Sequence, residues 1–160
     1  MIITLEDFEL RVCKVISIER YKYNRRLGHE SGMRIPEDHF KNELNGVAAE
    51  FALAKALNVW PPLSVTEAAP ADMLFNNVTI DVKQTPRKAG RLIMAVEKRK
   101  FCDWYCLVTG VVPEFTIVGF AKLGDLRKEE NLKDLGYGPT YVLEREELIN
   151  MQTFVKTIGL

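Results

Sequence analysis

The sequence predicts an α/β fold in which a central mixed β-sheet of about four to five strands is flanked by helices. Three observations support this prediction. Residues 36–57 carry apolar side chains at helical spacing. Residues 78–83 alternate β-branched and polar side chains, which is typical of a strand. Two nearly continuous apolar runs, 104–111 and 115–121, have the character of central strands covered on both faces.

Composition indicates one globular domain without global attraction to nucleic acid. The 160 residues can form a single substantial core, and 47% hydrophobic with 28% charged residues is ordinary for such a domain. Lys plus Arg and Asp plus Glu both total 22, so contacts with nucleic acid would have to come from local patches. Apolar runs are too short to cross a membrane, and the start of the chain lacks a secretory-signal pattern. We therefore expect a cytoplasmic protein with no membrane partner.

Cys13, Cys102 and Cys106 make an odd count of cysteines. Cys102 and Cys106 have no nearby His or second Cys pair to complete a zinc site. Buried thiols in a reducing cytoplasm are the preferred interpretation.

The first third of the chain is predicted to begin with a helix over about residues 5–19. Thr4 is the expected cap and Asp7 lies three residues further, as in a capping box. A strand over residues 10–18 is the alternative, because apolar residues there also fall in a period-2 register. The apolar residues at helical spacing are Leu5, Phe8, Val12, Val15 and Ile16.

Residues 20–34 are basic and contain glycines, which predicts an irregular loop. Such a loop could bind the phosphate backbone, since arginines bind phosphates and the interleaved tyrosines can stack on bases. A solvated loop without a ligand is the alternative. The residues assigned to nucleic-acid contact here are Arg20, Lys22, Arg25 and Arg26.

A second helix is predicted from Pro36 to about Leu57, because proline suits the first turn of a helix. Glu50 lies on this helix beside small and apolar residues, where a carboxylate needs a partner to offset burial. The alternative for Glu50 is a surface position near Lys55. Glu43 lies on nearly the same face and is an accessory candidate.

A hairpin follows, and it carries most of the candidate chemistry. Asn76-Asn77 separates two apolar runs and suits a turn with positive φ, which would fold Asp72 back beside Asp81. Period-2 geometry places Asp81 and Lys83 on one face of their strand, about 7 Å apart. Three acids and a lysine from a helix and a hairpin are suited to holding a hard divalent cation against a phosphate.

The ordered series Glu50, Asp72 and Asp81-Val82-Lys83 resembles the PD-(D/E)XK nuclease superfamily, whose signature is a helix acid, a hairpin acid and a (D/E)-x-K strand. The helix around Glu50 and the strand pair at 107–121 are similar to those of small phage and bacterial members. The resemblance covers roughly residues 43–123. The proline of the signature stands one position early, at Pro70.

This resemblance implies a restriction-endonuclease-like core and a role for each motif residue. Asp72, Asp81 and the backbone carbonyl of Val82 would bind Mg²⁺ or Mn²⁺, and Glu50 would bind it directly or through water. Lys83 would orient or deprotonate the attacking water, or stabilise developing charge. Gln84 and Thr85 extend the motif as accessory residues. DNA is the implied partner, and a homodimer is one assembly that the resemblance leaves open.

The remainder of the chain completes the core and adds an extension. Residues 85–91 form a second basic loop, either a DNA contact through Arg87, Lys88 and Arg91 or a solvated turn. A strand at 92–96 follows. Beyond the core, short surface helices are expected over 123–135, an extended piece over 140–143 and a helix over 145–151. The single domain thus has an N-terminal region (1–35), a core (36–123) and an extension (124–160).

The sequence therefore predicts a metal-dependent endonuclease acting on DNA. Two alternatives remain. One is a catalytically inactive nucleic-acid-binding or structural module on the same fold. The other is an unrelated α/β domain in which Asp81 and Lys83 form a structural ion pair.

Overall fold

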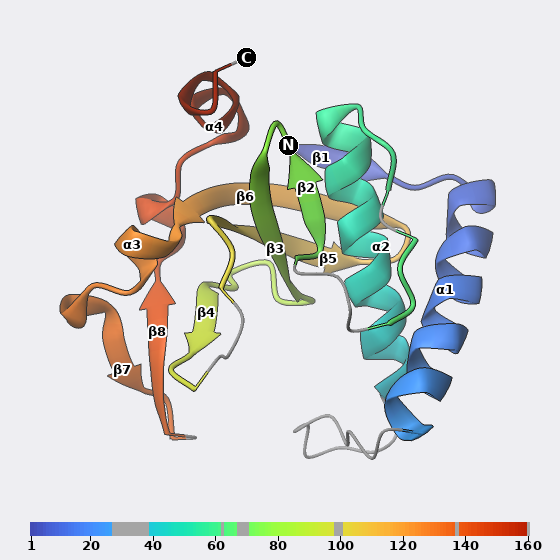
Figure 1. The fold of residues 1–160 in the computed structure, drawn as a ribbon, viewed down its shortest axis with the longest axis horizontal. Coiled ribbons are helices and arrows are strands. Elements are labelled where there is room, and N and C mark those ends of the chain that lie inside the picture. Colours follow the sequence, from blue (N-terminus) through green and yellow to red (C-terminus); the bar gives the residue numbers. More distant parts are fainter. Residues whose placement is uncertain (27–38, 62, 67–70, 98–100, 137, 160) are drawn as a thin grey trace.

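The structure is a computed structural model that describes residues 1–26, 39–61, 63–66, 71–97, 101–136 and 138–159, without the side chain of Arg25. A curved five-stranded sheet lies at its centre, two long helices lie beside it, and a smaller sheet lies on the other side (Figure 1). The long helices are α1 (Asp7–Arg26) and α2 (His39–Leu57). The strands of the large sheet are β1 (Ile2–Thr4), β2 (Met73–Phe75), β3 (Val78–Thr85), β5 (Trp104–Val111) and β6 (Glu114–Lys122).

The large sheet has the strand order β1-β6-β5-β3-β2. Strands β3 and β5 are parallel, and the other three pairs are antiparallel. The predicted α/β class with a mixed sheet is therefore confirmed. The smaller sheet has the order β4-β8-β7 and is entirely antiparallel. Its strands are β4 (Leu92–Ala95), β7 (Leu132–Asp134) and β8 (Pro139–Leu143).

Strand β5 is central and buried on both faces, as its apolar composition predicted. Cys106 and Val108 belong to a first core that also contains residues of α1 and α2. Tyr105 and Leu107 point the other way, into a second core shared with β4 and β8. This alternation follows from the two-residue period of a strand.

Helix α1 confirms the predicted helix and excludes the strand alternative, but its bounds differ. It continues to Arg26, so residues 20–26 are helical and the predicted loop is wrong there. The predicted cap is also wrong, because Thr4 belongs to β1 and pairs with Glu114. The backbone N–H of Glu6 instead donates to the Glu9 carboxylate at 2.7 Å. The rest of the predicted basic loop, residues 27–34, lies outside the described residues.

Helix α2 confirms the predicted second helix from His39 onward, and Pro36 lies outside the described residues. It ends at Leu57, and the next residue, Asn58, has a φ of 54°, the left-handed conformation that commonly terminates helices. Ala48, Ala49 and Ala52 are fully buried, so their small side chains let the helix pack closely into the first core.

The C-terminal extension differs from its prediction in two places. Residues 123–135 form α3 (Leu123–Leu126) and a 3-10 turn (Glu129–Asn131), but β7 then pairs with β8, so tertiary pairing replaces the expected helix. The helix expected over 145–151 is instead a 3-10 turn (Arg145–Glu147) followed by α4 (Met151–Thr157). Helix α4 starts late because the Asn150 side chain accepts the Thr153 N–H as a cap.

The strands predicted over 92–96 and 140–143 are confirmed as β4 and β8. All three cysteines are buried free thiols, as expected. Within the described part of the chain, no helix combines the length and apolar character needed to cross a membrane.

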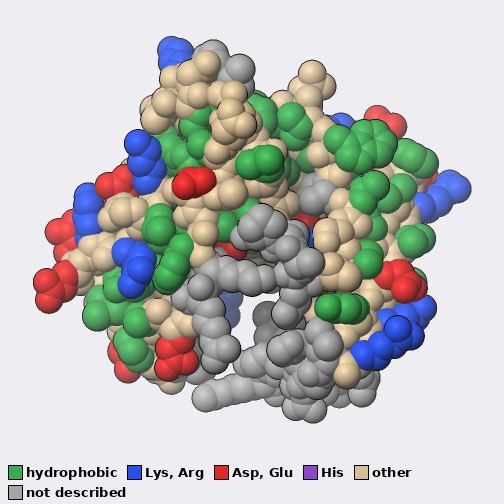
Figure 2. Space-filling view, in the orientation of Figure 1, with side chains coloured by type: hydrophobic (Ala, Val, Ile, Leu, Met, Phe, Trp, Pro, Cys, Tyr) green, Lys and Arg blue, Asp and Glu red, His purple; other side chains and the backbone are tan. Residues whose placement is uncertain are grey.

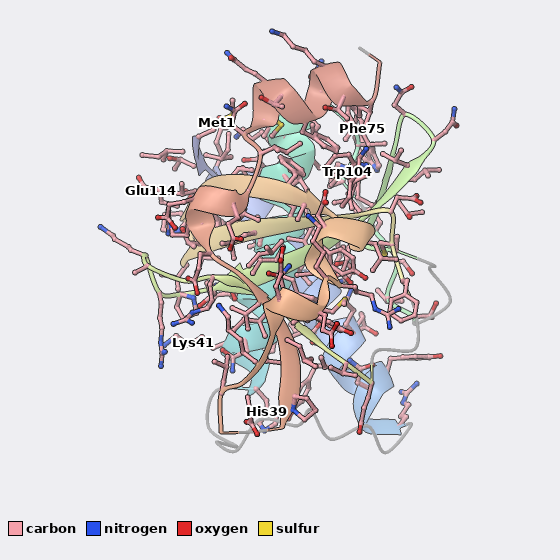
Figure 3. The ribbon with its side chains drawn as sticks, turned by 90° about the vertical axis from the view of Figure 1, so that its left-hand side faces the viewer. Met1, His39, Lys41, Phe75, Trp104 and Glu114 are labelled. Atoms are coloured by element: carbon pink, nitrogen blue, oxygen red, sulfur yellow. The ribbon has the colours of Figure 1, made fainter. Side chains whose placement is uncertain are left out.

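Helix α4 is held by one aromatic side chain. Phe154 is fully buried and stacks on Phe120 at 4.0 Å between ring centroids. It also meets Trp104 edge-on at 5.0 Å and Phe75 at 6.3 Å. Figure 3 labels Phe75 and Trp104 close to this helix. Phe154 thereby joins the C-terminal helix to strands β2, β5 and β6.

We predict that Phe154→Ala lowers the free energy of unfolding by about 3–5 kcal/mol, because it leaves a cavity among three aromatic rings. Urea unfolding monitored by circular dichroism measures the change. The control is Phe8→Ala on α1, where the side chain is 73% exposed, and its effect should stay within roughly 0.5 kcal/mol. Equal effects of the two substitutions would contradict this packing.

Candidate functional site

Strand β3 presents Asp81 and Lys83 on one face, as predicted. Ile80 and Val82 point into the first core, so the acid and the lysine lie on the opposite face. Lys83 Nζ lies 2.6 Å from Asp81 Oδ2. The Asp81 side chain is 11% exposed and that of Lys83 is 35% exposed. The ammonium group therefore compensates a carboxylate that is nearly removed from water, while Lys83 itself remains accessible.

Asp72 reaches the same strand from the other arm of the hairpin. The turn residues Asn76 and Asn77 both have positive φ, as predicted, and Met73 of β2 lies opposite Ile80 of β3. Asp72 directly precedes β2, and its Oδ2 accepts a hydrogen bond from the Val82 backbone N–H at 2.7 Å. The hairpin thus brings Asp72 beside the Asp81-Val82 peptide, as the sequence predicted.

Glu50 is held by an arginine from the neighbouring helix. The two terminal nitrogens of Arg20 donate to the two carboxylate oxygens of Glu50 at 2.7 and 2.9 Å. Arg20 Nε donates to the backbone oxygen of Ser64 at 2.8 Å. The side chains are 18% and 8% exposed, so this bidentate pair is largely buried between α1 and α2.

Other acids act on this buried pair. Burial raises the pKa of the Glu50 carboxyl to about 7, and the hydrogen bond from Arg20 opposes that shift. The negative charges of Asp72 and Glu43 raise the pKa of Glu50 further. Burial also raises the pKa of Glu43. Glu50, Glu43 and Asp72 therefore share one electrostatic environment around the Arg20 guanidinium, whose charged form all three stabilise.

The predicted acids form two neighbouring groups joined at the hairpin. Asp81 pairs with Lys83 on β3, whereas Glu50 pairs with Arg20. Asp72 accepts from the Val82 N–H of β3, and its charge also acts on Glu50. Among the described residues, no three His, Cys, Asp or Glu side chains are arranged to hold a metal ion. Asp72 and Asp81 nevertheless suit Mg²⁺, which is commonly bound by one or two carboxylates together with water and substrate phosphate.

The predicted nucleic-acid contacts differ in whether their side chains are exposed. Arg20 is engaged inside the protein, so it does not present a free guanidinium to a phosphate. Lys22 is exposed but pairs with Glu19 at 2.8 Å, and Arg26 is exposed. The side chain of Arg25 lies outside the described residues. In the second basic loop, Arg87 and Lys88 are exposed and Arg91 pairs with Glu144 at 3.3 Å.

The loop after β3 is attached to the extension at two points. Besides the Arg91–Glu144 pair, Arg145 donates to the backbone oxygen of Lys88. Figure 2 shows acidic and basic side chains recessed in the middle of this face, between the helices and the smaller sheet. The exposed Arg87 and Lys88 therefore lie on a loop that is held in place by contacts with the C-terminal extension.

The accessory residues Gln84 and Thr85 have local structural contacts. Gln84 Nε2 donates to the Gly110 backbone oxygen at 2.7 Å, and its side chain leaves β3 on the face opposite Asp81. Thr85 Oγ1 accepts from the Arg87 N–H at 3.4 Å. Gln84 therefore ties β3 to the end of β5.

Sequence reasoning missed Asp103 and Tyr105. The Asp103 carboxylate accepts hydrogen bonds from the backbone N–H and the hydroxyl of Thr79, at 2.8 and 2.7 Å, and so joins the starts of β3 and β5. Tyr105 lies opposite Asp81 in the sheet, and burial together with the charge of Asp81 raises its pKa. Asp103 could have been singled out from the sequence, because it is an acid directly before a predicted strand. Tyr105 could be identified only once the register between β3 and β5 was known.

Comparisons with protein-family models, with curated proteins and with solved structures return no match. The resemblance to the PD-(D/E)XK superfamily therefore stays a prediction, and the geometry of this chain is the basis for inferring its function.

We predict that Asp103→Ala destabilises the protein by about 1 kcal/mol near pH 6, through the loss of hydrogen bonds at an exposed site. Hydrogen bonds from Thr79 hold the pKa of Asp103 below its ordinary value. A carboxyl with a lower pKa in the folded state binds fewer protons there than in the unfolded state. Its stabilising contribution is therefore present above pH 4, approximately, and is lost as the pH falls through the folded pKa.

The measurement is urea unfolding of wild type and Asp103→Ala from pH 6 to pH 3. The control is Asp125→Ala, where the exposed carboxylate pairs with the exposed Lys128. A difference between wild type and Asp103→Ala that grows as the pH falls would contradict the assignment.

Proposed function

We propose that this chain is a metal-dependent endonuclease that hydrolyses DNA phosphodiester bonds, with its sheet and helices forming a restriction-endonuclease-like core. The observation that carries the proposal is the hairpin site: Asp81 paired with an accessible Lys83 on β3, and Asp72 fixed beside them by the Val82 N–H. A partly buried carboxylate pair with an adjacent ammonium group suits metal-assisted attack on a phosphate.

Asp72 and Asp81 would hold Mg²⁺ or Mn²⁺, with the Val82 carbonyl as a further oxygen ligand. Such an ion, when bound, lowers the pKa of its water and neutralises phosphate charge. Lys83 is one-third exposed and has three donor hydrogens, so it can donate to the attacking water or to a phosphate oxygen. Glu50 contributes negative charge beside Asp72, from a position fixed by Arg20.

Contacts with the DNA backbone would come from the exposed basic side chains near the site. Arg87 and Lys88 lie on the loop that follows β3, and Arg26 is exposed at the end of α1. With 22 cationic and 22 anionic residues, binding would depend on these local contacts and weaken steeply with salt. A homodimer that presents one site to each strand is part of this proposal.

The second candidate is a catalytically inactive nucleic-acid-binding or structural module. One observation favours it: the buried acids already have cationic partners, Arg20 for Glu50 and Lys83 for Asp81. A module of this kind would be stable without a metal ion, and divalent cations would not raise its melting temperature.

We predict that the protein nicks supercoiled plasmid or cleaves branched DNA in Mg²⁺ or Mn²⁺, and that EDTA abolishes the activity. Asp81→Asn and Lys83→Ala should each reduce the rate at least about 100-fold, because they remove a metal ligand and the ammonium group beside it. Gel assays of plasmid conversion measure the rates.

The matched controls are Asp125→Asn and Lys128→Ala, which alter an exposed ion pair of 3.3 Å outside the site. They should cleave at the wild-type rate. Equal cleavage by wild type, Asp81→Asn and Lys83→Ala on every substrate would exclude the proposed activity.

A further inference from the structure

Arg20 occupies an unusual position for a residue of a basic segment. It lies on α1, yet its guanidinium group crosses to α2, where both terminal nitrogens bond to Glu50. The third nitrogen bonds to the Ser64 backbone, in the segment that follows α2. All three nitrogens of the guanidinium group thus donate to protein oxygens, which fixes the orientation of its planar fork.

The charges around Arg20 do not balance within this group. Glu50, Glu43 and Asp72 each stabilise the charged guanidinium. Only Glu50 of these three acids contacts the guanidinium directly. The three acids together would exceed the one arginine in charge if all of them were ionised. Asp72 also belongs to the hairpin site, so negative charge in this group attracts a further cation toward Asp72.

We propose that Arg20 is a positioning residue of the site: it holds both oxygens of Glu50, so that Glu50 acts on a cation through water, and it competes with that cation for direct contact with Glu50. This proposal rests on the proposed metal-dependent function. It differs from a direct three-acid metal site, in which Glu50 would be a ligand equal to Asp72 and Asp81.

Arg20 already occupies both oxygens of the Glu50 carboxylate. Its Oε1 and Oε2 accept from Arg20 at 2.7 and 2.9 Å. A divalent cation that binds Glu50 directly must displace at least one of these charge-assisted hydrogen bonds. Arg20 and the cation thus compete for the Glu50 carboxylate. Removing Arg20 should therefore increase the affinity of the site for the cation.

The test is a calorimetric titration of Mn²⁺ into wild type, Arg20→Gln, Glu50→Gln and the double variant Arg20→Gln/Glu50→Gln. We expect Arg20→Gln to bind Mn²⁺ about tenfold more tightly than wild type, because a free Glu50 carboxylate joins the site. The increase should be absent from the double variant. Arg11→Gln, which removes an exposed charge from the same helix, is the control and should differ from wild type less than about twofold.

Equal or weaker Mn²⁺ binding by Arg20→Gln would overturn the proposal, and so would an increase that persists in the double variant. If Arg20→Gln does not fold, Arg20→Lys takes its place, since lysine keeps the charge but cannot form the bidentate fork. Arg20→Lys should then bind Mn²⁺ more tightly than wild type, and failure to do so would have the same meaning.

A measurement without metal tests the pair itself. In EDTA, Arg20→Gln should lower the melting temperature, because it leaves a buried carboxylate without its cation, and adding Glu50→Gln should recover part of the loss. Additive effects of the two substitutions on the melting temperature would contradict a direct Arg20–Glu50 pair. If the variants bind Mn²⁺ as expected but the protein does not cleave DNA, only the nuclease function is excluded. If the protein cleaves DNA but the effects of Arg20→Gln and Glu50→Gln on Mn²⁺ binding are additive, only the role of Arg20 is excluded.

Discussion

The two faces of β3 impose the constraint on which the site depends. Ile80 and Val82 are committed to the first core, so Asp81 and Lys83 must emerge on the opposite face. A slip of one residue in register would bury the ion pair in that core and expose the apolar residues. The register is fixed independently by β5 on one side and by the β2 hairpin on the other. Packing therefore determines where the candidate chemistry lies.

The second constraint is the buried ion pair between the long helices. Arg20 and Glu50 join α1 to α2, and Ser64 joins the following segment to the same guanidinium. A buried pair of this kind does not by itself add stability, since the cost of desolvating two charges can exceed their attraction. We therefore attribute the pair to the proposed site, in which Glu50 supplies a carboxylate near Asp72.

The sequence was sufficient to predict the features that depend on local pattern. Alternation predicted the faces of β3, and Asn76-Asn77 predicted the turn that returns Asp72 to the strand. The partner of Glu50 could not be predicted, because the pairing of α1 with α2 is a tertiary contact between residues 30 positions apart. The basic residues before Gly28 suggested a surface loop, but Arg20 lies on the inner side of a continuing helix. Strand β7 was missed for the same reason, since its pairing with β8 overrides a polar local sequence.

The central claim is that Asp72 and Asp81 hold a divalent cation while Arg20 retains Glu50. Anomalous diffraction from a crystal soaked in Mn²⁺ tests it most directly. The account predicts an anomalous peak in contact with the carboxylates of Asp72 and Asp81, with both hydrogen bonds from Arg20 to Glu50 intact. The absence of an anomalous peak at the hairpin would contradict it, and so would a Mn²⁺ ion bound directly by Glu50 with Arg20 displaced.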